Sequence, residues 1–338
     1  MSGTETTTHA IRRRAALAGA LALPALAIPA LGRGAAAQTP LILASGYPDG
    51  NFHTRTLRFF AERAAALTNG AVAITIHSNA SLIRLPEIRR AVQAGQVQIG
   101  EVLLGNHGNE DAIFEADSVP FLATGYEEAR RLYAAQKPML EARLQRQNQT
   151  LLYSVSWPSN GLFSRREITR LADLAGTKIR IYNALTQRFA EQFRAAPVII
   201  QVPDLPQAFA TGVADSMITS TPIVVNTRAW EFGRFWVDLN AFNPRNGVIM
   251  NLRAFRGLPE AQQAALRQAA AEAEARGWEL SESEDRQNHV TMAENGMKIA
   301  QVSAEMQAEV RAASEALIGP WAERAGPDGA ALRRAMAR

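Results

Sequence analysis

Segments with the periodicity of strands and helices alternate along the chain, and this order limits the possible fold more than any other feature. Residues 41–45, 72–77 and 97–104 are predicted to be strands. The amphipathic stretches between them, residues 54–67 and 86–94, are predicted to be helices. Parallel strands need such crossover helices, so the order predicts a mainly parallel sheet that is covered by helices.

A second set of the same kind begins near residue 150. Strands are predicted at four places, residues 151–156, 178–182, 198–201 and 214–218, with helices between them. In both sets a glycine, Gly95 or Gly212, separates the end of a helix from the next strand. We therefore predict two similarly wound α/β domains that face each other.

The composition changes after residue 258. Pro259 is suited to the start of a helix, and helix-forming residues continue to about Glu294, interrupted only by Gly277. A single helix over this stretch would be about 54 Å long, which exceeds the diameter of one domain. Two ordinary helices that are broken at Gly277 are the alternative. A final helical region over residues 303–336 is expected to pack on the outside.

The first 37 residues have the pattern of a targeting segment. An arginine triplet at residues 12–14 precedes an apolar run over residues 15–31, and three alanines at residues 35–37 form a small-residue cleavage site. The apolar run is shorter than the roughly 20 residues that span a bilayer. We expect cleavage before Gln38, export to the periplasm by the twin-arginine or Sec pathway, and a soluble mature protein without direct membrane insertion.

Composition argues against several classes of function. The targeting segment holds four arginines and one glutamate, so the formal net charge of +4 falls to about +1 once it is removed. Nucleic-acid binding therefore loses its main support. The absence of cysteine excludes disulfides, thiol catalysis and thiolate metal sites.

Common enzyme motifs are missing. The sequence has no G-x-S-x-G, H-E-x-x-H, Walker A or G-x-G-x-x-G pattern. Glu110, Asp111, Glu115 and Asp117 form an acidic cluster that could hold a metal ion, although carboxylates that cap helices are more typical of such a pattern. We therefore predict no catalytic, cofactor or metal site, and a periplasmic metal-dependent hydrolase is a remote alternative.

Arg180 and Tyr182 fall on one face of the predicted strand over residues 178–182, near its carboxyl end. Ligands bind at this edge of open α/β sheets. A guanidinium group there can grip a carboxylate through two parallel hydrogen bonds. An ordinary salt bridge at the surface is the alternative interpretation of Arg180.

Four segments, in the right order, resemble the solute-binding proteins of TRAP transporters, the extracytoplasmic receptors of tripartite ATP-independent periplasmic transporters. These segments are DSVPFL at residues 117–122, ADLAGTKIRIYN at 172–183, AFATGVAD at 208–215 and VIMN at 248–251. The similarity covers roughly residues 41–285. No single motif is decisive, but the four together identify the chain as a member of this family.

The resemblance implies a two-domain periplasmic-binding-protein fold, similar to class II, with a long helix across both domains. Domain I would comprise residues 38–160 and about 248–275, and domain II residues 161–247 and about 276–338. The domains would close over a small organic carboxylate and deliver it to the membrane subunits of the transporter. An ABC-type binding protein for organic anions is the main alternative, and the long helix after residue 258 argues against it.

The resemblance also implies ligand contacts. Arg180 would bind the carboxylate. Asn183 matches an asparagine that contacts the ligand in the family, although it could instead cap a helix. Thr219, with Ser220 beside it, stands where many members have an asparagine, which puts the usual contacts to a sugar acid in doubt.

Two further candidates come from the residues themselves. Glu101 lies in an otherwise apolar strand, where a buried carboxylate needs a partner, either a ligand hydroxyl or an arginine. His53, next to Phe52, lies in the first loop between a strand and a helix, where backbone N–H groups favour anions.

Asn160, Phe52, Trp157 and Tyr182 are further candidate ligand contacts, and the residues that follow Asn160 bear on the kind of ligand. Many members of the family have a second arginine two residues after the glycine that corresponds to Gly161, whereas Leu162 and Phe163 occupy this region here. Several aromatic residues lie near strand ends or hinge segments, namely Phe52, Trp157, Tyr182, Trp230 and Trp236. We therefore predict an aromatic or apolar 2-oxo or 2-hydroxy monocarboxylate as the ligand, rather than a sugar acid.

Overall fold

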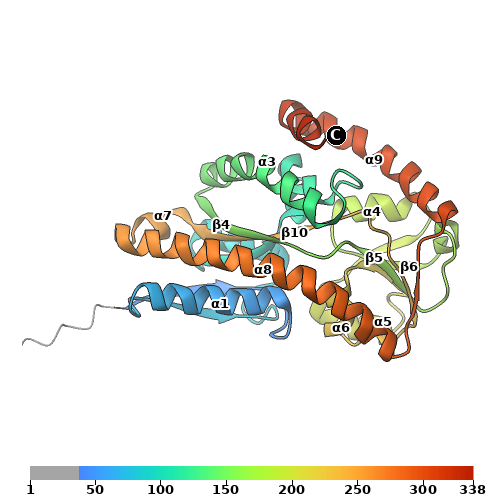
Figure 1. Ribbon diagram of the computed structural model, residues 1–338, viewed down its shortest axis with the longest axis horizontal. Helices are drawn as coiled ribbons and strands as arrows, with labels where there is room; N and C mark the ends of the chain where they lie inside the picture. Colours follow the sequence, from blue (N-terminus) through green and yellow to red (C-terminus); the bar gives the residue numbers. More distant parts are fainter. Residues whose placement is uncertain (1–37, 338) are drawn as a thin grey trace, which may run out of the picture. The chain divides into compact units, whose positions relative to one another are not determined.

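Two mixed sheets organise residues 38–337, the part of the chain that the computed structural model describes (Figure 1). The predicted targeting segment and its cleavage site fall on residues 1–37 and lie outside the described residues. The first sheet has the strand order β2-β1-β3-β10-β4. Its strands are β1 (Thr39–Ala44), β2 (Val72–His77), β3 (Ile99–Leu103), β4 (Gln149–Ser156) and β10 (Arg245–Asn251).

The second sheet has the order β11-β9-β5-β8-β6-β7. Its strands are β5 (Gly161–Ser164), β6 (Lys178–Ile181), β7 (Ala196–Ile199), β8 (Ser216–Thr219), β9 (Phe235–Val237) and β11 (Lys298–Ala300). In each sheet one strand is antiparallel to both of its neighbours, β10 in the first and β5 in the second, while the remaining pairs are parallel. The prediction of mainly parallel sheets is confirmed. The alternation of strands and helices in the sequence did not predict the two antiparallel strands, β10 and β5.

The helices lie between these strands along the chain, except for the last helix, which follows the last strand. They are α1 (Phe52–Leu67), α2 (Leu85–Ala94), α3 (Gly125–Arg146), α4 (Ala184–Glu191), α5 (Leu205–Ala210), α6 (Thr221–Asn226), α7 (Leu252–Arg256), α8 (Glu260–Glu294) and α9 (Ala304–Met336). Short 3-10 segments, among them η1 (Leu104–His107), η2 (Ala112–Ser118) and η4 (Val202–Asp204), follow several strands. Local chemistry sets the ends: Asn51 caps α1, and Gly95 ends α2 in the left-handed conformation with φ 77°.

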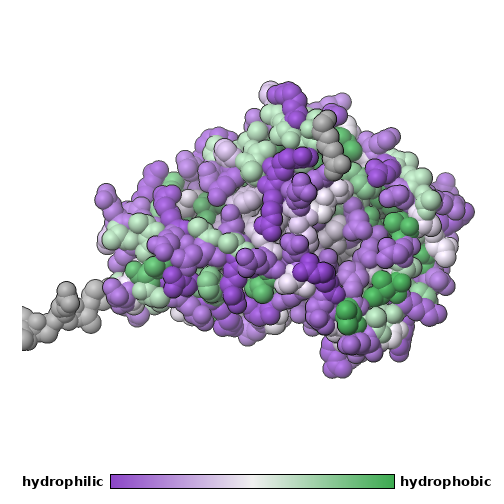
Figure 2. All heavy atoms as spheres, viewed as in Figure 1, coloured by the Kyte–Doolittle hydropathy of each residue, from purple (hydrophilic) through white to green (hydrophobic). Residues whose placement is uncertain are grey.

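The long helix α8 is continuous through Gly277 and contains 35 residues, which confirms the single-helix prediction. In Figure 1 it runs from beside α1 and β4 towards α6. Trp278 donates from Nε1 to the carbonyl of Ser154 in β4 at 2.9 Å, and Asp285 accepts from Thr221 at the start of α6 at 2.7 Å. The helix therefore contacts β4 of the first sheet and α6, the helix that follows β8 of the second, and it also contacts β11 of the second sheet. Hydrophilic side chains predominate on the face of the molecule that Figure 2 shows.

Two chain segments connect the sheets and pair with each other. Residues 157–160 lead from β4 to β5, and residues 238–244 lead back from β9 to β10. The N–H of Trp157 donates to the carbonyl of Pro244 at 2.8 Å, and that of Asn160 to the carbonyl of Phe242 at 3.0 Å. Residues of both segments therefore lie where the carboxyl ends of strands from the two sheets meet.

The strands of the two sheets divide the chain close to the predicted domain boundaries, but the division into domains stays a prediction. The described residues belong to one compact unit. The last helix, α9, which was assigned to domain II, packs against α3 and η2 as well as α4. Trp321 of α9, for example, donates to the carbonyl of Ala112 at 2.8 Å. This helix is therefore not confined to the elements of the second sheet.

Candidate functional site

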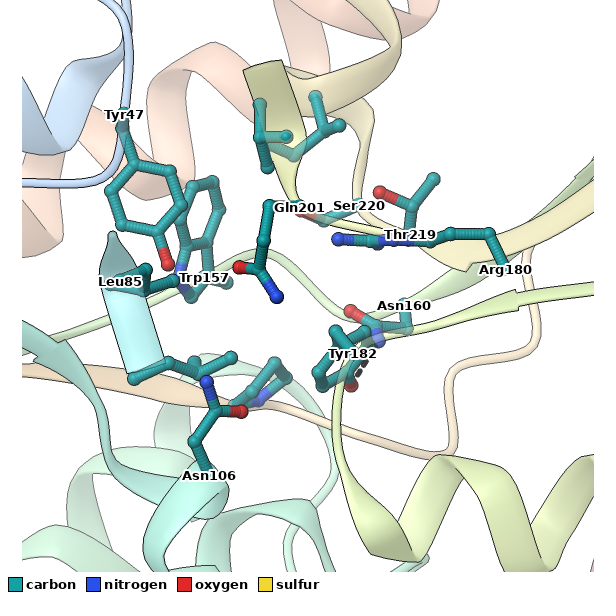
Figure 3. A pocket seen from close by; sticks show the side chains of 14 residues that line it. Tyr47, Leu85, Asn106, Trp157, Asn160, Arg180, Tyr182, Gln201, Thr219 and Ser220 are labelled. Carbon is teal, nitrogen blue, oxygen red and sulfur yellow. Dashed lines mark hydrogen bonds between the residues drawn. The ribbon is translucent and has the colours of Figure 1, made fainter. Parts of the chain in front are cut away.

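A cavity of about 40 Å³ lies where strand ends of both sheets approach each other (Figure 3). Most of its wall comes from residues at or just after the carboxyl ends of strands, and from the start of helices α2 and α6. It is lined by Tyr47, Leu85, Leu103, Asn106, Trp157, Asn160, Arg180, Tyr182, Gln201, Val202, Thr219, Ser220, Ile223 and Pro244. Six of the ten predicted ligand contacts are among these residues: Trp157, Asn160, Arg180, Tyr182, Thr219 and Ser220.

Arg180 is a buried cation that faces this cavity. Its side chain is held by two backbone carbonyls: Nε donates to Ile200 at 2.9 Å and Nη1 to Ile218 at 3.2 Å. Among the described residues, no carboxylate forms an ion pair with it, and burial lowers the pKa of Arg180 to about 10. The ring of Tyr182 lies 5.5 Å from the guanidinium carbon. A buried charge without a counter-ion is costly, so the site is suited to an anionic ligand.

The wall near Arg180 presents further hydrogen-bonding groups. Thr219 is 2% exposed, and its Oγ1 has no hydrogen-bond partner among the described residues. The same holds for Oδ1 of Asn106, on another part of the wall. Asn160 donates from Nδ2 to the hydroxyl of Tyr182 at 2.5 Å. Buried polar atoms are usually paired, so the free atoms in the wall are available to a ligand.

Three predicted contacts lie behind the wall rather than in it. Glu101 accepts hydrogen bonds from Ser45 at 2.6 Å and from Asn246 at 2.9 Å, and burial raises its pKa to about 7. Nδ1 of His53 lies 3.3 Å from the same carboxyl group. Phe52 packs edge-on against Trp157, with ring centres 5.3 Å apart. Among the described residues, the buried partners of Glu101 are thus a serine, an asparagine and a histidine, and not an arginine.

Asn183 is outside the set of wall residues and adopts its alternative role. Its Oδ1 accepts from the N–H of Thr186 at 2.8 Å, which caps α4. Its Nδ2 donates to Ser118 of η2 at 3.4 Å. The capping bond uses the acceptor of the side chain, and the bond to Ser118 uses its donor.

The residues used to predict the kind of ligand also lie elsewhere. Leu162 and Phe163 in β5 are 1% and 0% exposed and are core residues outside the cavity wall. Trp230 and Trp236 do not line the cavity either. Its apolar surface comes instead from Trp157 and from a set of aliphatic residues, Leu85, Leu103, Val202, Ile223 and Pro244. The inference from Leu162 and Phe163 to the shape of the ligand therefore has no support in this geometry.

Tyr47, Asn106 and Gln201 line the cavity but were missed in the sequence. Each follows a strand within three residues: Tyr47 after β1, Asn106 after β3 and Gln201 after β7. The rule that selected Arg180, a polar residue at the carboxyl end of a strand, applies to all three. What the sequence lacked was a sign of which strand ends meet.

The carboxylates of the predicted acidic cluster form ion pairs with arginine side chains. Glu110 pairs with Arg89 and Glu115 with Arg324. Asp111 lies 2.7 Å from Arg143 and also caps η2 by accepting from the N–H of Ile113. Among residues 38–337, no group of three or more His, Cys, Asp or Glu side chains is arranged to hold a metal ion.

No helix within residues 38–337 is both long enough and apolar enough to cross a membrane.

Comparison with known proteins adds to this geometry. Residues 43–324 match the family model DctP, described as bacterial extracellular solute-binding protein, family 7. The C4-dicarboxylate-binding periplasmic protein DctP of Rhodobacter capsulatus is 27% identical over 333 residues, which cover 93% of this chain and 94% of that protein.

Two crystal structures from Bordetella pertussis are more similar, and both are named as extracytoplasmic solute receptors that bind pyroglutamic acid. DctP7 is 40% identical with a TM-score of 0.87, covering 89% of this chain and 100% of that chain. DctP6 is 42% identical with a TM-score of 0.87, covering 88% and 99%. With the family match over most of its length, the chain belongs to the DctP family of bacterial extracellular solute-binding proteins, the receptors of TRAP transporters.

Proposed function

We propose that this protein captures a compact monocarboxylate in the cavity at Arg180 and delivers it, in the periplasm, to the membrane subunits of a TRAP transporter. The observation that carries the proposal is the buried guanidinium of Arg180, which faces the cavity and has no acidic partner among residues 38–337. A ligand carboxylate would supply the missing negative charge and accept two hydrogen bonds in the geometry that a guanidinium favours. Contacts to both sheets would then favour a closed form of the receptor.

The cavity wall supports one carboxylate rather than two. Arg180 is the only cationic side chain among the described residues that line it, and much of the remaining surface is aliphatic or aromatic. The small volume of the cavity favours a compact body, because a single water molecule needs roughly 10–15 Å³ on the same kind of measure. These features support a small monocarboxylate more than a C4-dicarboxylate or a sugar acid.

Pyroglutamate is the first ligand to test. The two receptors with 40% and 42% identity are named as binding pyroglutamic acid, a compact cyclic monocarboxylate. The relative with 27% identity is named as binding C4-dicarboxylates, so family membership alone does not decide the ligand. An aromatic 2-oxo or 2-hydroxy acid, as expected from the sequence, is the competing candidate of the same charge.

Calorimetric titration of the refolded, ligand-free protein tests the proposal. The ligand set comprises pyroglutamate, phenylpyruvate, phenyllactate, succinate and galacturonate. We expect the tightest binding for pyroglutamate, phenylpyruvate or phenyllactate, with pyroglutamate first. Tighter binding of the dicarboxylate succinate or of the sugar acid galacturonate than of all three of these would overturn the proposed ligand class.

Delivery to the transporter needs a separate experiment. Vesicles that contain the membrane subunits should take up the ligand only when this receptor is added, because the receptor presents the bound ligand to them. Uptake that is the same without the receptor would overturn this part of the proposal.

A further inference from the structure

A buried asparagine connects the cavity wall to Glu101. Asn246 lies in β10 and is 1% exposed. Its Oδ1 accepts a hydrogen bond from Nε1 of Trp157 at 2.9 Å and another from the hydroxyl of Tyr47 at 3.4 Å. Its Nδ2 donates to Glu101 at 2.9 Å. Trp157 and Tyr47 both line the cavity, whereas Asn246 and Glu101 lie behind it.

The orientation of the Asn246 amide is fixed from both sides. The indole N–H of Trp157 can only donate, so it requires the oxygen of the amide and not the NH₂ group. On the other side, the carboxyl group of Glu101 accepts from the NH₂ group, and it is itself held by Ser45 at 2.6 Å. A reversed amide would place two donors against each other at Trp157.

This orientation decides what the hydroxyl of Tyr47 can do in the cavity. A phenol has a single hydrogen, and here it is donated to Oδ1 of Asn246. The lone pairs of the Tyr47 oxygen remain, so towards the ligand the hydroxyl acts as an acceptor. In Figure 3, Tyr47 and Trp157 lie together on one side of the cavity, and Arg180, Thr219 and Tyr182 lie on the other.

We propose that Tyr47 selects carboxylates that carry a hydrogen-bond donor, an N–H or O–H group, close to the carboxylate, and that Asn246 is the positioning residue that keeps Tyr47 an acceptor. The proposal rests on the proposed function, because it presumes that Arg180 binds the carboxylate of a small ligand across the cavity. It favours lactams and 2-hydroxy acids over lactones and 2-oxo acids. Of the two kinds of acid that the sequence left as candidates, we therefore expect tighter binding of the 2-hydroxy acid than of the 2-oxo acid.

The selectivity follows from the cost of a mismatched pair. A ligand with an acceptor in place of the donor would face the lone pairs of Tyr47, or would force its hydroxyl to turn away from Asn246. In either case a buried polar atom loses its partner. Sites that are built to pair with a ligand donor reject analogues that lack it. We expect a preference of roughly tenfold to a hundredfold.

The test compares pyroglutamate with 5-oxotetrahydrofuran-2-carboxylate, in which a ring oxygen replaces the N–H and the shape is nearly unchanged. Wild-type protein should bind the lactam at least about tenfold more tightly than the lactone in calorimetric titrations. Tyr47→Phe should bring the two affinities to within about threefold of each other, because the acceptor is gone. Tyr153→Phe is the matched control: it removes a buried hydroxyl outside the cavity wall and should keep the wild-type ratio.

The positioning role is tested by the same ratio. Asn246→Leu removes the acceptor to which Tyr47 donates, so the hydroxyl can turn its hydrogen towards the ligand and the lactone should gain relative to the lactam. Glu101→Gln keeps an acceptor for Nδ2 of Asn246 and should retain most of the preference. Melting curves show whether each variant is folded. If Asn246→Leu does not fold, the comparison of Tyr47→Phe with Tyr153→Phe decides.

The outcomes separate this inference from the proposed function. Equal affinities for lactam and lactone in the wild type, with binding still dependent on Arg180, would overturn the role of Tyr47 and leave the receptor function intact. A wild-type preference that persists in Tyr47→Phe would overturn it as well. Failure of every small monocarboxylate to bind would overturn the proposed function, and this inference with it.

Discussion

The guanidinium group of Arg180 donates hydrogen bonds to the carbonyl oxygens of Ile200 and Ile218. Ile200 follows β7, and Ile218 belongs to β8. Both partners are neutral, so they orient the side chain without cancelling its charge. Burial lowers the pKa of Arg180 to about 10, and a ligand carboxylate would reverse this effect. At the residue scale, the proposed anchor is a preformed cation that has no carboxylate partner among residues 38–337.

Removing this cation should abolish most of the binding. Truncating one partner of a buried, hydrogen-bonded charge pair costs about 2–5 kcal/mol, so Arg180→Ala should weaken ligand binding by roughly 30- to 3,000-fold. Arg180→Lys should restore little, because an ammonium group cannot reproduce the planar fork. Calorimetric titration and melting curves of both variants measure the two effects.

Arg84→Ala is the control for this prediction. Arg84 pairs with Asp204 at 3.3 Å, and both side chains are at least half exposed. Exposed ion pairs contribute little, so affinity should stay within about threefold of the wild type. If Arg180→Ala also binds within about threefold, Arg180 is not the carboxylate anchor.

At the scale of elements, the packing of α8 depends on Gly277, a residue without a side chain. Gly277 lies where α8 passes β4 and α1, and a Cβ atom there would lie 2.6 Å from Cγ2 of Val155 and 3.1 Å from Cγ2 of Thr56. Trp278 and Ser281, which follow Gly277 in α8, donate to the carbonyls of Ser154 and Ser156 at 2.9 and 2.7 Å. The helix cannot move away from Val155 without losing these bonds.

Gly277→Ala should therefore destabilise the protein, although alanine is the better helix former by about 1 kcal/mol. The close contact with Val155 outweighs this gain, since overpacking a core typically costs about 1–3 kcal/mol. Chemical denaturation of the wild type and the variant measures the difference. In the double variant Gly277→Ala, Val155→Ala the two substitutions should partly compensate each other, because the smaller residue 155 makes room for the new methyl group. A more stable Gly277→Ala single variant would contradict the packing argument.

At the scale of the whole molecule, His289 of α8 binds to the segment of residues 238–244, which leads from the second sheet back to the first. Its Nδ1 faces the carbonyl of Asp285 at 2.9 Å, and its Nε2 faces the carboxylate of Asp238 at 3.0 Å. Both partners accept, so both ring nitrogens carry hydrogen and the ring is charged. The hydrogen bond with Asp238 raises the pKa of His289 to about 9.

This pKa shift predicts a loss of stability at alkaline pH. The pKa of His289 is higher in the folded protein than the ordinary 6.5 of the unfolded chain, so its contribution is fully present below pH 6.5 and is lost as the pH rises through about 9. The melting temperature of the wild type should fall between pH 7 and pH 9.5. His289→Gln, which keeps a donor but no charge, should show a flatter curve over this window. Parallel curves for the two proteins would show that His289 is not charged in the folded state.

Local patterns in the sequence were enough for much of the fold. Periodicity and helix-terminating residues located most of the strands and helices, because these signals depend on neighbours within a few residues. The position of Arg180 near the end of β6 is an example, whereas the continuity of α8 through Gly277 was implied by the family resemblance. The family resemblance, carried by four short motifs, is confirmed by the match over residues 43–324.

Only the tertiary structure decided which strand ends meet and how their side chains are paired. Tyr47 and Gln201 line one cavity although they follow strands of different sheets, and β10 enters the first sheet although it comes after five strands of the second sheet in the chain. Whether Asn183 caps α4 or faces a ligand, and whether the hydroxyl of Tyr47 donates or accepts, depends on partners as remote as Ser118 and Asn246. Hydrogen-bond direction is set by such distant partners, and no local sequence pattern encodes them.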